Sequence, residues 1–367
     1  MKKLLFLLFA GLLMTACTDS DDEENIDDPV AICNIIEVLD NINEPTVWED
    51  GFVYVINGSD IGVHSVLTIE PGAIIKLRNA RINILQDGKI LAEGTANKRI
   101  VFTSLADDSQ CGDTNGDGNS SDAEKGDWKG IQLSGSIGSV FKYVDIFYAG
   151  QNSGGESHAV EITWNQSVAF TFDHCRIAHT FYQNSSYNSS CAFEGSSEMR
   201  DANVSKFTNN AIYDSGKPIH LSAFYNLDPS NIFHNPEDPS QKNTHNGIYL
   251  HYNGSASGTT VNWNNTEVPY VFDQYSQVFD PATINIGANV VVKFMNSSAG
   301  LQREAPQNIN IASTAILTSY KDDEHGGDTN GDGNASFPTA GDWKGLYNNF
   351  NENPHWDQSP NILYAAN

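Results

Sequence analysis

The chain has 367 residues, which is enough for one large or two ordinary domains. Its formal net charge is −26, from 20 Lys and Arg against 46 Asp and Glu, and this argues against nucleic acid as a partner, because such binding needs a Lys/Arg surface. Glycine is common and long helical patterns are missing, so the composition predicts an all-β fold of short strands joined by turns.

Residues 1–16 have the pattern of a targeting segment. Lys2 and Lys3 precede an apolar run, residues 4–14, that is too short to span a membrane as a helix of the mature protein. The run leads into Leu-Met-Thr-Ala-Cys at residues 13–17. This resembles a bacterial lipoprotein signal peptide, in which Cys17 becomes the lipidated (for example palmitoylated) first residue. The alternative is a plain secretory signal cut near Ala16.

Residues 17–45 are expected to form a tether or linker. The tract Thr-Asp-Ser-Asp-Asp-Glu-Glu at residues 18–24 is acidic and cannot pack against a core. It resembles the export tract of some Gram-negative surface lipoproteins. That resemblance implies a location at the cell surface, on the outer membrane, with a lipid anchor as the contact with the membrane.

Four further cysteines, Cys33, Cys111, Cys175 and Cys191, leave the disulfide pairing open. Disulfides are allowed outside the cytoplasm, and four cysteines permit three pairings. Cys175–Cys191 is the most local candidate. Buried free thiols are the alternative.

From residue 46 the chain contains short apolar runs with alternating polar positions, each bounded by Gly, Asn or Asp. The runs are too short for helices and too closely spaced for the strands of a sandwich. They predict coils of a β-solenoid, in which each coil adds short parallel strands to long sheets. A segment that starts at Trp48 begins again 215 residues later at Trp263. We therefore expect one module copy plus further coils at 46–260, and a second, shortened copy at 261–367.

A different repeat lies between the two copies. Phe-Thr-Phe-Asp-His-Cys-Arg-Ile at 170–177 and Ser-Lys-Phe-Thr-Asn-Asn-Ala-Ile at 205–212 match at a step of 35 residues. A polar residue recurs just before an inward apolar one: Cys175, Asn210 and Asn231. Such residues are expected to stack as a ladder that satisfies backbone groups at the bends.

The strongest repeat is an acidic loop. The segment Gly-Asp-Thr-Asn-Gly-Asp-Gly-Asn occurs at 112–119 and at 327–334, and 18 of the 28 positions from 103 to 130 match their partners 215 residues on. Asp113, Asn115 and Asp117, followed by glycine, form the D-x-N-x-D-G opening of a calcium loop. Ca²⁺ prefers six to eight oxygen ligands, and alternating Asp and Asn side chains supply them where the backbone curls. No helical pattern flanks either loop.

The sequence therefore predicts one Ca²⁺ in each copy. Glu124 stands at the twelfth position, where a bidentate carboxylate belongs, but Thr339 replaces it in the second copy, so a shared carboxylate is expected to complete each site. The alternative is a polar turn without a metal. The expected ligands are Asp107, Asp108, Asp113, Asn115, Asp117, Asn119, Glu124 and Asp127 in the first copy, and Asp322, Asp323, Asp328, Asn330, Asp332, Asn334 and Asp342 in the second.

Aromatic and histidine residues give weaker indications. Trp48, Trp128 and their twins in the second copy are expected to be packing residues. Trp164 and Trp356 have no twin, and they are the candidates for stacking on a glycan. The histidines on successive coils are expected to be solvent-facing strand residues rather than a metal or acid–base site.

The order of these segments, from Leu-Thr-Ile-Glu-Pro-Gly-Ala-Ile-Ile-Lys at 67–76 to Gly-Asp-Trp-Lys-Gly-Ile at 126–131, resembles the right-handed parallel β-helix lipoproteins of Gram-negative cell surfaces. The resemblance covers nearly all of the chain from about residue 46. It implies a right-handed parallel β-helix, but it names no activity. The expected role is a calcium-stabilised structural or binding module for a polysaccharide or a surface protein, without catalytic residues. The alternative is a polysaccharide lyase or glycosidase on the same scaffold.

Overall fold

The computed structural model describes residues 33–151, 157–163, 168–183, 190–195, 199, 201–252, 259–350 and 354–366. Cys33–Asn367 form one compact unit. The expected signal peptide, the lipidated Cys17 and the glycan candidate Trp164 lie outside the described residues. Within the described ranges, no helix is long and apolar enough to cross a membrane.

The described part of the chain is almost entirely parallel β-sheet, and its one helical element is the short 3₁₀ turn η1 (Pro306–Asn308). A seven-stranded sheet contains, in spatial order, β1 (Asn34–Glu37), β3 (Phe52–Asn57), β6 (Ile74–Arg78), β9 (Ile100–Ser104), β12 (Val144–Phe147), β15 (Arg176–Ala178) and β18 (Ala211–Tyr213). A ten-stranded sheet contains β28 (Ile316–Ser319), β25 (Val291–Phe294), β22 (Tyr270–Phe272), β20 (Ile248–His251), β19 (Ile219–Ser222), β16 (Cys191–Gly195), β13 (His158–Ile162), β10 (Gly130–Leu133), β7 (Arg81–Ile84) and β4 (Ile61–Val63).

Three smaller sheets complete the architecture. The six-stranded sheet contains β17 (Lys206–Thr208), β14 (Ala169–Asp173), β11 (Ile137–Lys142), β8 (Lys89–Glu93), β5 (Val66–Ile69) and β2 (Thr46–Trp48). The three-stranded sheet contains β21 (Thr260–Trp263), β24 (Thr283–Ile286) and β27 (Ile309–Ile311). The four-stranded sheet contains β23 (Tyr275–Val278), β26 (Gly300–Arg303), β29 (Leu346–Asn348) and β30 (His355–Trp356).

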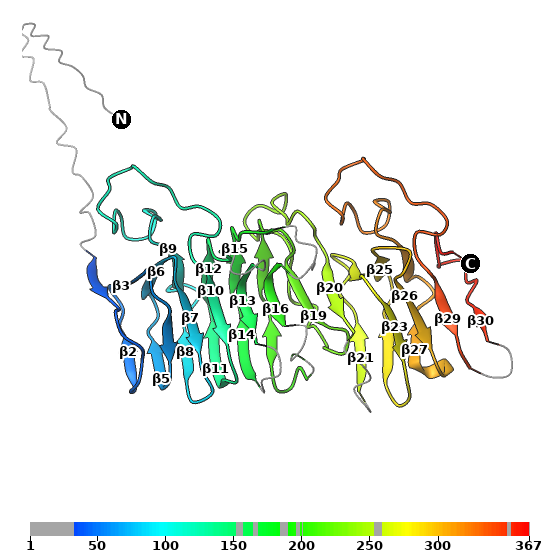
Figure 1. Cartoon of the computed structure of the whole chain (residues 1–367), viewed down its shortest axis with the longest axis horizontal. Coiled ribbons are helices and arrows are strands. Elements are labelled where there is room, and N and C mark those ends of the chain that lie inside the picture. The colour runs from blue at the N-terminus through cyan, green and yellow to red at the C-terminus, as the bar shows by residue number, and fades with distance from the viewer. Residues whose placement is uncertain are drawn as a thin grey trace, which may run out of the picture. The chain divides into compact units, whose positions relative to one another are not determined.

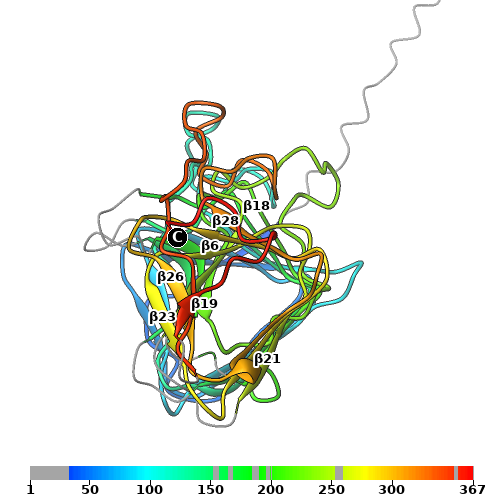
Figure 2. The same ribbon diagram turned by 90° about the vertical axis from the view of Figure 1, so that its right-hand side faces the viewer.

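The chain visits these sheets in rotation. From β2 to β19, successive strands belong in turn to the six-, seven- and ten-stranded sheets, and from β21 to β29 to the three-, ten- and four-stranded sheets. A strand therefore pairs in parallel with the strand one coil later, and β30, which runs antiparallel to β29, is the exception. The coils stack along one axis (Figure 1) and superimpose when viewed along it (Figure 2). The expected all-β class is confirmed, and the long parallel sheets fit a parallel β-helix.

Alternating side chains make the core. In β5 and β7 every second residue is buried, as expected where one face of a strand points inward. Most of the buried apolar residues form one cluster that runs from Ile42 to Leu346, and two small clusters are separate from it: Val53, Val55 and Leu105, and Ala178, Ala211 and Tyr213. The tryptophans expected to pack are buried in both copies. Trp128 and Trp343 also make the same bond, because each indole N–H donates to a carbonyl of a neighbouring coil, at 2.8 and 2.7 Å.

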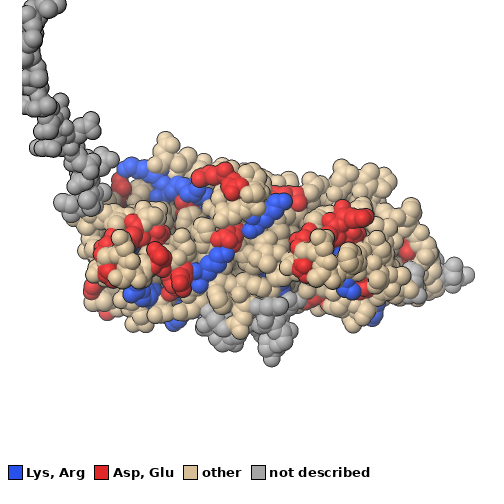
Figure 3. Space-filling model, turned by 90° about the horizontal axis from the view of Figure 1, so that it is seen from above, with Lys and Arg blue, Asp and Glu red and all other residues tan. Residues whose placement is uncertain are grey.

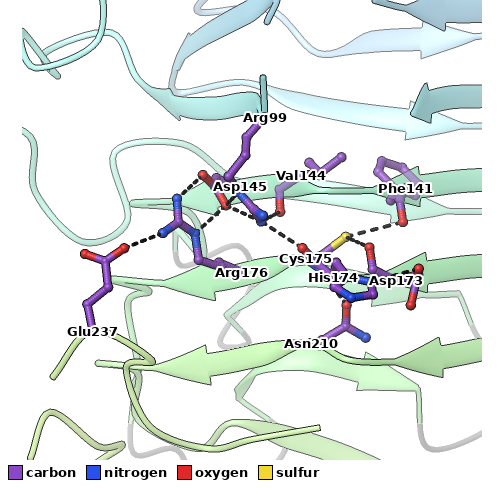
Figure 4. Close-up of polar contacts among 10 residues, drawn as sticks. All are labelled: Arg99, Phe141, Val144, Asp145, Asp173, His174, Cys175, Arg176, Asn210 and Glu237. Atoms are coloured by element: carbon purple, nitrogen blue, oxygen red, sulfur yellow. Dashed lines mark hydrogen bonds and ion pairs between the residues drawn. The ribbon is translucent and has the colours of Figure 1, made fainter. Parts of the chain in front are cut away.

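The expected polar ladder is present. Asn210 Oδ1 accepts the backbone N–H of Cys175 at 2.8 Å (Figure 4), and Asn231 Oδ1 accepts the N–H of Asn210 at 3.0 Å. The two Asn side chains also donate to buried carbonyls, including that of Phe172 at 3.1 Å. Each amide thereby satisfies backbone groups at the bend, where the sheet bonds stop.

A buried ion-pair network joins three neighbouring coils (Figure 4). The Asp145 carboxylate, on β12, accepts hydrogen bonds from Arg99 Nε at 2.7 Å and from Arg176 Nε at 2.7 Å. Its side chain is 3% exposed, whereas that of Glu237, which pairs with the outer side of Arg176 at 3.2 Å, is 79% exposed. One buried carboxylate therefore compensates two partly buried guanidinium groups.

The ordered stack begins earlier than residue 46, where the sequence placed the end of the linker. β1 pairs with β3 over four residues, and Cys33 forms a disulfide with Cys111. The most local pairing, Cys175–Cys191, is wrong, because both thiols are free and buried. Each of these thiols is instead close to a backbone carbonyl of its surroundings.

Reduction of the Cys33–Cys111 disulfide is expected to release the first coil. The bridge spans 78 residues of sequence, and closing a loop of this length stabilises a fold by about 2–4 kcal/mol. Since coils contact mainly their neighbours, faster hydrogen exchange is expected to concentrate in β1 and β3. Hydrogen exchange on a Cys33→Ser/Cys111→Ser variant measures this, with Cys175→Ser as the control. Equal exchange rates of β1 and β3 in the double variant and in the wild type would contradict the expectation.

Candidate metal centres

Two long insertions interrupt the stack and project from the same side of it (Figures 1 and 2). The first loop, residues 105–129, joins β9 to β10, and the second loop, residues 320–345, joins β28 to β29. The strand before each loop pairs with the strand one coil earlier, β6 or β25. Seen from above, Asp and Glu side chains gather over both loops (Figure 3). The duplicated sequence thus corresponds to a duplicated structural unit, a strand pair with an acidic loop above it.

One carboxylate organises the turn of each loop. In the second loop, Asp328 Oδ1 accepts the backbone N–H of Gly331 at 2.7 Å, and Oδ2 accepts that of Gly333 at 2.8 Å. Asp113 makes the same bonds in the first loop. Gly331 and Gly333 have φ values of 69° and 67°, a left-handed conformation that glycine adopts without a steric cost. The D-x-N-x-D-G spacing is therefore what allows this tight curl.

Three carboxylates converge at the turn of the second loop. Oxygen atoms of Asp323, Asp328 and Asp332 lie within 4.8 Å of one another. The Oδ1 atoms of Asp323 and Asp332 are buried and accept no hydrogen bond. Burial raises the pKa of the Asp323 carboxyl, and the nearby Asp328 acts in the same direction. A buried anionic oxygen without a partner is costly, so this arrangement is suited to a hard cation with oxygen ligands.

The first loop repeats part of this arrangement. Its corresponding residues are Asp108, Asp113 and Asp117, and Asp108 Oδ1 is again buried without a hydrogen-bond partner. Among the described residues, these three carboxylates do not come as close together as their partners in the second loop. The two loops therefore share the turn and the partnerless oxygen, and they differ in how far the carboxylates converge.

The other shared carboxylates hold the ends of the loops. Asp322 accepts a hydrogen bond from Thr318 Oγ1 at 2.6 Å, and Asp342 accepts one from Ser319 Oγ at 2.7 Å. Asp107 and Asp127 are held in the same way in the first loop, by Thr103 and Ser104. Asp322 keeps one oxygen without a partner, but Asp323 is the residue that reaches the converging group.

The remaining expected ligands are the asparagines of both loops and Glu124 of the first loop. The side-chain amides of Asn115 and Asn330 each donate to the carboxylate two residues later, at 3.0 Å. Asn119 and Asn334 are exposed. Glu124 is also exposed, and its backbone N–H donates to the Asp127 carboxylate at 3.0 Å. The twelfth-position carboxylate of the first loop, Glu124, therefore points to solvent, and the converging group of the second loop forms without a carboxylate at that position.

Sequence reasoning missed a buried lysine beneath each loop. Lys76 in β6 and Lys293 in β25 are fully buried. Lys293 Nζ donates to the Gly327 carbonyl at 2.6 Å and to Thr329 Oγ1 at 2.9 Å, and Lys76 makes the equivalent bonds in the first loop. The available signal was a lysine inside an otherwise apolar strand in both copies. Each amine fastens its loop to the coil below.

The burial of Lys293 predicts a pH dependence of stability. Burial lowers its pKa to about 8 from an ordinary value of 10.5, although Asp323, Asp322 and Asp328 oppose this. Between these two values the unfolded chain keeps a proton that the folded chain has released, so Lys293 makes the free energy of unfolding rise with pH. Below about pH 8 the Lys293 amine is protonated in both the folded and the unfolded chain, so it no longer changes the free energy of unfolding with pH.

Buried groups such as the Cys175 thiol, whose pKa burial raises to about 12, act in the opposite direction above pH 9. The measurement is therefore a difference: denaturant unfolding of the metal-free wild type and of Lys293→Met at several pH values from 7 to 9.5. The advantage of the wild type over the variant is expected to grow with pH. A constant difference would show that the buried amine does not titrate in this window.

The weaker candidates from the sequence, Trp356 and the histidines, make only local contacts. Trp356 is partly buried on β30, and its ring packs on Tyr347 with a centroid distance of 4.9 Å. His174, His179 and His234 each lie 2.6–3.0 Å from a carboxylate. Each is a single imidazole–carboxylate contact, and none belongs to a group of three metal-binding side chains among the described residues.

Comparisons with known protein families, with curated proteins and with solved structures found no match for this chain.

Proposed function

We propose that this chain is a lipid-anchored protein of the outer surface of a Gram-negative cell. Its right-handed parallel β-helix is stabilised by Ca²⁺ in the two acidic loops, and it presents its sides to a polysaccharide or a surface protein. The handedness rests on a general rule, since parallel strands joined by a crossover are almost always connected in the right-handed sense. The anchor rests on the lipoprotein-like residues 1–17 and the acidic tether.

The observation that carries the calcium proposal is the set of oxygens in the second loop. Asp323 and Asp332 each bury a carboxylate oxygen that accepts no hydrogen bond, and Asp328 lies within the same 4.8 Å group. Three converging carboxylates supply hard oxygen donors, which favour Ca²⁺. Mg²⁺ demands a stricter octahedral geometry, and Zn²⁺ prefers nitrogen and sulfur. The role of the ion is structural: it neutralises the carboxylates of an insertion that has no apolar core of its own.

Calcium titration of the purified mature chain tests this proposal. Calorimetry is expected to give two Ca²⁺ per chain, with Mg²⁺ competing weakly. Asp328→Asn/Asp332→Asn is expected to remove one equivalent, and Asp113→Asn/Asp117→Asn the other. Absence of binding at millimolar Ca²⁺ would refute the proposal, and equal loss of both sites from either variant would refute the independence of the two loops.

The binding role is tested separately on a panel of polysaccharides. Retention of the chain on a glycan without new chain ends is expected for a binding module. New reducing or unsaturated ends would contradict this role and favour the lyase or glycosidase alternative. The lipid anchor is tested by mass spectrometry of the protein from membranes, where Cys17→Ser is expected to lose the acyl chains and the membrane association.

A further inference from the structure

A second cluster of metal-binding side chains lies on the ten-stranded sheet, away from both loops. His158 at the start of β13 and Cys191 at the start of β16 are partners in the parallel register, and Glu194 follows on β16. One ligand atom from each residue lies within 4.8 Å of the other two. His158 and Cys191 are 8% and 2% exposed, and the Glu194 side chain is 13% exposed. The group is therefore sheltered, and it mixes a thiol, an imidazole and a carboxylate.

The separations suit a tetrahedral ion. Cys191 Sγ lies 3.6 Å from His158 Nδ1 and 3.7 Å from Glu194 Oε2. Zn²⁺ binds sulfur at about 2.3 Å and nitrogen or oxygen at about 2.0–2.2 Å, so tetrahedral angles place such donor atoms about 3.6 Å apart. The two sulfur-centred distances already have this value, and the imidazole and the carboxylate lie within 4.8 Å of each other.

Neighbouring groups would support an ion at this place. His220, on β19, is the register partner of Glu194, and its Nδ1 lies 2.8 Å from Glu194 Oε2. Carboxylate–histidine pairs of this kind orient metal ligands. A divalent ion with one thiolate and one carboxylate would leave the cluster neutral.

We propose that His158, Cys191 and Glu194 bind a transition-metal ion of the Zn²⁺ class through Nδ1, Sγ and Oε2. On binding, the metal–sulfur bond replaces the S–H bond of Cys191, and the proton leaves to solvent. Three protein ligands leave a fourth position for water or another small ligand. The donor set separates this site from the two loops, whose all-oxygen ligands suit a hard cation.

Cobalt titration of the purified, metal-stripped chain tests this assignment. Co²⁺ replaces Zn²⁺ in such sites and reports a thiolate ligand by a charge-transfer band in the near ultraviolet. One equivalent of Co²⁺ is expected to produce this band, and one equivalent of Zn²⁺ to abolish it. Cys191→Ser is expected to lack the band, and Cys175→Ser, which alters the other buried free thiol, to keep it. The calcium-loop variant Asp328→Asn/Asp332→Asn is also expected to keep it.

Two further variants keep the test decisive if Cys191→Ser folds poorly. Glu194→Gln removes a ligand, and His220→Asn removes its positioning partner, so each is expected to weaken Zn²⁺ binding by about 10-fold or more. Circular dichroism verifies that each variant is folded. The proposal is overturned if the wild type gives no charge-transfer band at stoichiometric Co²⁺, if the band survives in folded Cys191→Ser, or if neither Glu194→Gln nor His220→Asn weakens Zn²⁺ binding.

Discussion

Removal of calcium is expected to lower the melting temperature of this protein by about 5–10 °C. A ligand that binds only the folded state at about 100 times its Kd stabilises it by about 2.7 kcal/mol per site, so two loops contribute about 5 kcal/mol. For a chain of this length, that energy corresponds to a shift of several degrees. The physical cause is the repulsion between the carboxylates of each loop, which the cation removes. In the second loop, Asp323 and Asp332 each have a buried oxygen that accepts no hydrogen bond, so no protein donor offsets their charge there. Thermal unfolding in EDTA and in excess Ca²⁺ measures the shift.

The control is a carboxylate of the same loop that lies outside the converging group. Glu324→Gln removes one negative charge from the second loop and is expected to keep the full calcium-dependent shift. Asp328→Asn/Asp332→Asn is expected to keep about half, because the first loop still binds. If the melting temperature in EDTA equals that in excess Ca²⁺, calcium does not stabilise the loops.

Asp145→Ala is expected to reduce the free energy of unfolding by about 3–5 kcal/mol, because it removes the buried partner of two arginines. Arg99 and Arg176 both bond to Asp145, and their side chains are only 19% and 25% exposed. Without the carboxylate, both guanidinium groups stay partly desolvated with less compensation. The damage is expected to spread over three coils, because the network joins β12 to the coils on either side. Urea unfolding of the variant measures the loss.

Glu237→Ala is the matched control, since it also removes a carboxylate that pairs with Arg176. Glu237 is largely exposed, and exposed ion pairs contribute about 0–1 kcal/mol. A loss for Asp145→Ala no larger than that for Glu237→Ala would mean that the buried network contributes no more than a surface pair.

Repetition made the fold predictable. Short alternating runs, such as those around Leu67 and Ile82, have too few residues for an independent sheet, so they require neighbours of the same kind. The Cys175–Asn210 step of the ladder was also predictable, because its 35-residue spacing is visible in the sequence, whereas Asn231 follows Asn210 after 21 residues and is a weaker match. The grouping into five sheets was not, because a change of sheet occurs in turns whose geometry short polar segments do not specify.

The candidate metal loop was predictable in its position and in part of its composition. The D-x-N-x-D-G spacing located Asp328 and Asp332, since local backbone geometry brings alternate residues together. The choice of Asp323 among the remaining carboxylates depended on which of them are engaged by β28, the strand that leads into the loop, and Thr318 and Ser319 of this strand engage Asp322 and Asp342. The partners His158 and Cys191 are 33 residues apart and meet only through the strand register, which local spacing does not reveal.

The antiparallel strand β30 has a consequence for assembly. Stacked parallel strands end in an unpaired row of backbone groups, onto which a second molecule could add its own strands and start a fibre. Here β30 occupies that row on β29, and Ile362 bridges to Leu317 on β28. Among the described strands, β28 and β29 are therefore engaged at this end of the stack, whereas β27 is the edge of its sheet, so a second stack would meet an open row of backbone groups on one of the three sheets instead of all three.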